Sequence, residues 1–182
     1  MQPLVNDAVY ILDSNTFITP FRNYYSIRYF PSYWQWLKDT FQQNAERLIL
    51  PEIVYLELIA GGQEDNLSTW VKDNLSSLVY ADYRQSSVFW ERYAEVLDYI
   101  HSSGLFKEPG RSNWDSLNKA DPQLVALASI NGWKIVTFEE RVHNLSPKNP
   151  MKKEPKIPNI ADHFGAECVN VYELEEEFGL LV

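Results

Sequence analysis

Acidic side chains follow or interrupt apolar runs at several widely separated places in this sequence. Asp13 ends the run AVYIL, Glu57 lies within PEIVYLELIA, and Asp121 precedes the helical pattern PQLVALASIN. Glu139 and Glu140 come just after the run WKIVT. Mg²⁺ and Mn²⁺ prefer oxygen ligands, so acids without matching cations would suit a divalent ion if the fold brought them together.

The elements that must position these acids can be read from the apolar pattern. Four short apolar runs predict buried strands, at 8–12, 48–50, 133–137 and 168–171. Helical spacing and capping residues predict helices at 33–46, 52–60, 67–75, 87–101, 121–131 and 172–178. Proline, glycine, lysine and asparagine predict loops at 104–113 and 144–159.

Strands that alternate with helices predict one α/β domain over residues 1–182, with a mainly parallel sheet between two helical layers. Right-handed crossovers bring the carboxyl ends of such strands to one edge, where ligands bind in these sheets. By this topology Asp13, Glu57, Asp121 and Glu139 lie near the same edge. The sequence therefore predicts a carboxylate cluster there.

Each acid also has a plainer interpretation. Asp121 suits a helix N-cap, Glu57 an exposed position on an amphipathic helix, and Asp13 a turn after a strand. An ionised glutamate in so apolar a helix is nevertheless costly unless it reaches water or a cation. The joint placement of the three residues favours a site over three separate explanations.

Composition limits the class of protein. The chain has 182 residues and a formal net charge of −9, which argues against a protein that coats nucleic acid. Cys168 is the lone cysteine, no long apolar run suggests a membrane span, and no basic-then-apolar leader is recognisable, so we expect a cytoplasmic protein. The segment 141–156 is basic around the single acid Glu154, and its local field would attract phosphate.

Four motifs in order resemble the PIN-domain family of metal-dependent ribonucleases. They are YILDSN (Tyr10–Asn15), LPEIVYLEL (Leu50–Leu58), KADPQLVALA (Lys119–Ala128) and KIVTFEE (Lys134–Glu140). The resemblance covers roughly residues 8–174. This chain has Glu139 where the family more often has aspartate, so either Glu139 or Glu140 could act as the fourth acid.

The resemblance implies that the protein hydrolyses RNA phosphodiesters with Mg²⁺ or Mn²⁺. The implied catalytic and metal-binding residues are Asp13, Glu57, Asp121 and Glu139, holding one ion or two. Asn15, Thr137 and Glu140 would not bind the ion themselves but would lie next to its ligands, where Asn15 and Thr137 would orient carboxylates or water. The cations expected to bind RNA are Lys119, Arg141, Lys152, Lys153 and Lys156.

The stretch KIPNIADHFGAECVNVYEL resembles a toxin-like (VapC-like) PIN subfamily, some members of which are toxins of type II toxin–antitoxin pairs. An antitoxin protein is therefore an expected partner, and PIN-like enzymes often form homodimers. Ten aromatic residues between Phe17 and Phe41 suit stacked bases, or a core that continues into a partner surface.

Other classes fit less well. A phosphotransferase of the haloacid dehalogenase type would need an acid where this chain has Asn15, and a response-regulator receiver would need paired acids and a strand-end lysine that are not evident. The serious rival is a non-catalytic PIN-like module that binds RNA or protein.

Overall fold

A five-stranded, wholly parallel sheet forms the centre of the molecule. The computed structural model describes residues 7–60 and 66–180. The strands are β1 (Tyr10–Leu12), β2 (Leu48–Pro51), β3 (Val79–Tyr80), β4 (Lys134–Val136) and β5 (Cys168–Val169). Their order across the sheet is β3-β2-β1-β4-β5. Tyr10 is in register with both Leu48 and Lys134, so β1 lies at the middle of the sheet.

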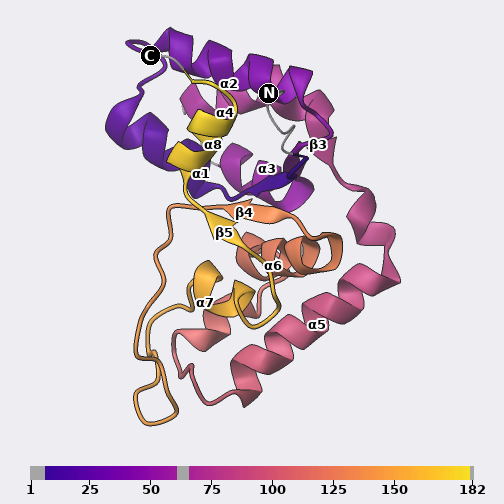
Figure 1. Ribbon diagram of the computed structural model, residues 1–182, viewed down its shortest axis with the longest axis vertical. Helices are drawn as coiled ribbons and strands as arrows, with labels where there is room; N and C mark the ends of the chain where they lie inside the picture. Colours follow the sequence, from indigo (N-terminus) through magenta and orange to yellow (C-terminus); the bar gives the residue numbers. More distant parts are fainter. Residues whose placement is uncertain (1–6, 61–65, 181–182) are drawn as a thin grey trace, which may run out of the picture.

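Helices cover both faces of the sheet, which confirms the predicted three-layer α/β/α architecture. In Figure 1, α2, α4 and α8 lie on one side of the strands, whereas α5, α6 and α7 lie on the other. The helices are α1 (Asn15–Thr19), α2 (Pro31–Gln43), α3 (Glu52–Ile59), α4 (Asn66–Leu75), α5 (Ser87–Ser102), α6 (Ala120–Asn131), α7 (Ile157–Ala161) and α8 (Val171–Glu177). Shorter helical turns occupy Pro20–Tyr24, Ser76–Leu78, Asp82–Gln85 and Arg111–Trp114.

Local chemistry explains where the elements flanking the site begin and end. Pro51 ends β2 and remains extended, with φ −64° and ψ 147°, so α3 begins at Glu52 instead. α6 ends at Gly132, whose φ of 69° lies in the left-handed region that glycine adopts without strain. This confirms the stop that the sequence predicts for that helix.

Several predicted boundaries were wrong. β3 was missed because two half-buried residues leave no periodic signal. The helix expected at 33–46 begins earlier, at Pro31, because proline suits a first helical turn. The loop expected over 144–159 ends sooner, since α7 already begins at Ile157.

The aromatic segment contributes mainly to the core. Phe17, Tyr33, Trp34 and Phe41 are buried, and Trp34 donates a hydrogen bond from Nε1 to the Tyr25 carbonyl at 2.6 Å. In contrast, some neighbouring rings stay on the surface, namely Tyr24, Tyr29 and Phe30. Among the helices described, none is both long enough and apolar enough to cross a membrane.

Candidate active site

Asp13 lies directly after β1, the central strand, and its side chain is only 3% exposed. Its backbone N–H donates to the Val136 carbonyl at 3.0 Å, which ties the end of β1 to the end of β4. Its carboxylate Oδ2 accepts a hydrogen bond from the Thr137 hydroxyl at 2.8 Å. The sheet therefore holds this carboxylate in one place.

Thr137 and Asn15 form a hydrogen-bonded support behind Asp13. The Thr137 hydroxyl accepts from Asn15 Nδ2 at 3.3 Å and from the Glu139 N–H at 3.1 Å. Asn15 Oδ1 in turn accepts from the Phe138 N–H at 3.0 Å. These bonds join the turn after β1 to the turn after β4, so they orient the Asp13 carboxylate.

Asp121 lies in the first turn of α6, and it is 8% exposed. Its side chain does not cap the helix, so the N-cap interpretation does not hold. Instead, Asp121 Oδ2 forms an ion pair with Lys119 Nζ at 3.1 Å, and the same ammonium pairs with Glu154 Oε1 at 2.8 Å.

Glu57 is half-buried on α3 and reaches the same helix start. Its Oε1 accepts a hydrogen bond from the Ala120 N–H at 3.0 Å. Because Ala120 is the first residue of α6, this N–H has no partner within the helix. Glu57 thus links α3 to the helix that carries Asp121.

Glu139 follows β4, but both of its carboxylate oxygens are engaged. Oε1 pairs with Lys156 Nζ at 2.6 Å, and Oε2 accepts from the Ile157 N–H at 2.7 Å. The carboxylate therefore lies at the start of α7 and holds the chain that enters that helix. Glu140 is exposed.

The acids act on one another electrostatically. The pKa of Asp13 is raised to about 6, mainly by burial; the Thr137 hydrogen bond opposes this rise, and the nearby charges of Glu139 and Glu57 add to it. Burial also raises the pKa of Asp121 to about 7, against the attraction of Lys119, with Asp13 and Glu139 adding to the rise. Acids from four distant segments thus share one electrostatic field.

The donor chemistry fits a divalent ion only in part. Buried carboxylates that repel one another are relieved by a hard cation, and Asp13 and Asp121 meet this condition. Yet within residues 7–60 and 66–180, no group of three or more Asp, Glu, His or Cys side chains converges closely enough to hold an ion. Asp121 and Glu139 are instead each paired with a lysine, namely Lys119 and Lys156. The role of Glu139 as a ligand stays a prediction.

The five cations expected to bind RNA fall into two groups. Lys119 and Lys156 face the acids of the site, and Arg141 pairs with Asp162. Lys152 and Lys153 are exposed and form no ion pair with any residue in the described part of the chain. These last two lysines face solvent without an ion-pair partner among the described residues, as a contact to phosphate requires.

The basic loop that carries these lysines is held firmly against the segment before α6. Met151 exchanges backbone hydrogen bonds of 2.8 Å with Leu105 and Lys107. A Cβ on Gly110 would lie 2.2 Å from the Lys153 carbonyl oxygen, so only glycine allows this close approach. The loop is thereby placed to carry Glu154 and Lys156 to the site.

Sequence reasoning gave no role to Glu154, although it stands alone among the bases of 141–156. Its ion pair with Lys119 joins the basic loop to the start of α6. A single acid within a basic segment was the signal that could have indicated this contact.

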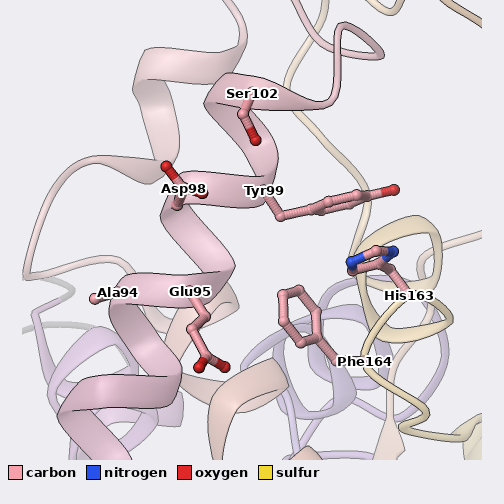
Figure 2. A pocket seen from close by; sticks show the side chains of 7 residues that line it. All are labelled: Ala94, Glu95, Asp98, Tyr99, Ser102, His163 and Phe164. Carbon is pink, nitrogen blue, oxygen red and sulfur yellow. The ribbon is translucent and has the colours of Figure 1, made fainter.

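A separate hollow of about 610 Å³ lies between α5 and the residues after α7. Figure 2 shows the rings of Tyr99, His163 and Phe164 gathered on one side of it, with Glu95 and Asp98 projecting from α5. Tyr99 and His163 stack with centroids 3.7 Å apart. None of the residues expected in the site lines this hollow.

The parallel sheet between two helical layers, with four motif segments at its carboxyl edge, defines an α/β/α protein. The chain belongs to the family described as a domain of unknown function, DUF4411, which matches residues 10–180. No curated protein matches it.

Solved structures that are similar to the chain include two VapBC structures. DNA-bound VapBC from Salmonella typhimurium is 17% identical with a TM-score of 0.49, and the match covers 90% of this chain and 98% of that one. VapBC2 from Rickettsia felis, bound to a DNA fragment from its promoter, is 16% identical with a TM-score of 0.46. This match covers 81% of this chain and 99% of that one. At these values the likeness concerns the course of the chain alone.

Proposed function

We propose that the protein is a metal-dependent endoribonuclease that hydrolyses RNA phosphodiesters at the carboxylate edge of its sheet. The observation that carries this proposal is the burial of Asp13 and Asp121, whose pKa values rise to about 6 and about 7. A folded protein keeps such acids together at a cost in stability, and this cost is common at functional sites. The four motifs that resemble PIN ribonucleases supply these residues.

Each side chain has a separate task in this proposal. Asp13, Asp121 and Glu57 would hold Mg²⁺ or Mn²⁺, which makes water more acidic and neutralises charge on the phosphate. Thr137 and Asn15 keep the Asp13 carboxylate oriented. Lys152 and Lys153 would attract the RNA backbone from the loop. No covalent intermediate with the protein is needed.

The test is cleavage of a labelled single-stranded RNA with Mg²⁺, with Mn²⁺ and with chelator. We expect cleavage with either ion, none with chelator, and none for Asp13→Asn. Asp98→Asn, an exposed acid on α5, is the matched control and should cleave like the wild type. Cleavage by Asp13→Asn at the wild-type rate would exclude Asp13 from the mechanism.

The second candidate is a non-catalytic module that binds RNA or protein. One observation favours it: Lys119 and Lys156 already neutralise Asp121 and Glu139 without any metal. This candidate predicts an intact fold, RNA retention in a filter-binding assay and no cleavage with either ion.

As a possible partner we propose an antitoxin protein, on the strength of the toxin-like resemblance of residues 156–174. The exposed rings of Tyr24, Tyr29 and Phe30 offer apolar surface for such a protein. Co-expression with the neighbouring open reading frame, followed by co-purification, tests this partner. The homodimer and the cytoplasmic location stay predictions.

A further inference from the structure

Lys119 lies between two acids from different parts of the chain. Its Nζ is 3.1 Å from Asp121 Oδ2 and 2.8 Å from Glu154 Oε1. Asp121 belongs to α6, whereas Glu154 belongs to the basic loop. The ammonium can therefore leave one carboxylate without losing the other.

The positive charge of this ammonium lies beside Asp121, where a divalent cation would bind. Two cations on one carboxylate repel each other, so the ammonium opposes the binding of a metal ion there.

Glu154 provides the place to which Lys119 can withdraw. Its loop is anchored by the Met151 hydrogen bonds and by the close approach at Gly110, so Glu154 cannot follow Lys119 freely. The pair formed by Lys156 with Glu139 is different, because Glu139 also accepts the Ile157 N–H and so has a structural task at α7.

We propose that Lys119 is a built-in cation that competes with the divalent metal for Asp121, and that Glu154 positions Lys119 by holding it when the metal binds. This inference rests on the proposed function, since it concerns the same metal. Lys119 thereby sets how tightly the protein holds the ion. Lys119 and Glu154 both act through Asp121, so they are positioning residues.

The experiment measures Mn²⁺ affinity by electron paramagnetic resonance, with isothermal calorimetry as a second readout. Lys119→Met should bind Mn²⁺ about tenfold more tightly than the wild type, because the competing charge is gone. Lys119→Arg should restore affinity near the wild-type value. Lys148→Met, an exposed lysine of the basic segment 141–156, is the control for simple loss of charge and should change affinity little.

The Glu154→Gln variant should change the affinity in the opposite direction. Without its second acid, Lys119 remains on Asp121, so we expect Mn²⁺ to bind several-fold more weakly. In the Lys119→Met background the same Glu154→Gln change should have no effect, because the two residues act as a unit. A Glu154→Gln effect of equal size in both backgrounds would show that Glu154 acts only through its charge, which overturns its assigned role.

Failure of this inference and failure of the proposed function give different results. If the wild type binds Mn²⁺ and Lys119→Met binds it equally or more weakly, Lys119 holds Asp121 in place and the inference is wrong. If neither the wild type nor Lys119→Met binds Mn²⁺, the proposed metal-dependent function fails together with it. Circular dichroism on each variant shows that the fold is intact, and Lys119→Gln replaces Lys119→Met if the latter does not fold.

Discussion

Two acidic regions of this molecule differ in how they treat their charges. In the hollow beside α5, Glu95 is 61% exposed in its side chain and pairs with Arg92 one helical turn away, at 2.9 Å. At the carboxyl edge of the sheet, Asp13 and Asp121 are almost completely buried. The hollow has the larger volume, yet its acids, Glu95 and Asp98, are exposed to solvent like acids on any helix surface.

Desolvated charge therefore marks this candidate site better than empty volume does. Exposed acids cost the fold little, because water screens them. Buried acids that repel one another lower stability, and the fold retains them only with hydrogen bonds and lysines arranged around them. Each substitution below changes one of the two regions and leaves the other unchanged.

Among these substitutions, the largest effect on RNA cleavage is expected where a hydrogen bond to Asp13 is removed. Thr137→Val keeps the shape of this buried side chain but removes the hydroxyl that orients Asp13, so RNA cleavage should fall about 10- to 100-fold. Thr40→Val is the matched control, because Thr40 is also buried and donates to the Trp36 carbonyl within α2. Equal rates for the two variants would show that the Thr137 hydroxyl has no catalytic task.

A smaller effect concerns stability without metal. Asp13 has a pKa of about 6 in the folded protein against 3.8 ordinarily, so folding favours its protonated form. Its contribution to stability is complete below about pH 4 and is lost as the pH rises through 6. Asp13→Asn cannot ionise and should be more stable than the wild type by about 1–3 kcal/mol at pH 8, with little difference at pH 4.

Urea denaturation at both pH values, in chelator, measures this difference. Adding Mn²⁺ at pH 8 should stabilise the wild type but not Asp13→Asn. Parallel stability curves for the two proteins across this pH range would contradict the assignment of repulsive burial at Asp13.

The smallest effect is expected in the hollow. Glu95→Gln and Asp98→Asn should each change the free energy of unfolding by no more than about 0.5 kcal/mol, because both side chains are exposed. RNA cleavage should also stay at the wild-type rate. A large loss of cleavage in either variant would mean that the hollow takes part in the function and would break the contrast between the two regions.

The sheet and the placement of the acids could be predicted because both depend on short-range patterns. Apolar runs such as Ala8–Leu12 indicate buried strands, and the parallel topology brings the residues after them to one edge. The lone acid Glu154 signalled a contact, but the partners of Glu154 and Lys156 could not be predicted, since they depend on where the basic loop folds back. That course depends on tertiary contacts at Gly110 and Met151 that no local pattern encodes.

The most direct test of the central claim is equilibrium binding of Mn²⁺ to the wild type and to Asp121→Asn, at a pH near 8 where both buried acids are ionised. The account predicts saturable binding by the wild type and a loss of affinity on the order of 100-fold or more in the variant. Equal binding by the two proteins, or none by the wild type, would contradict it.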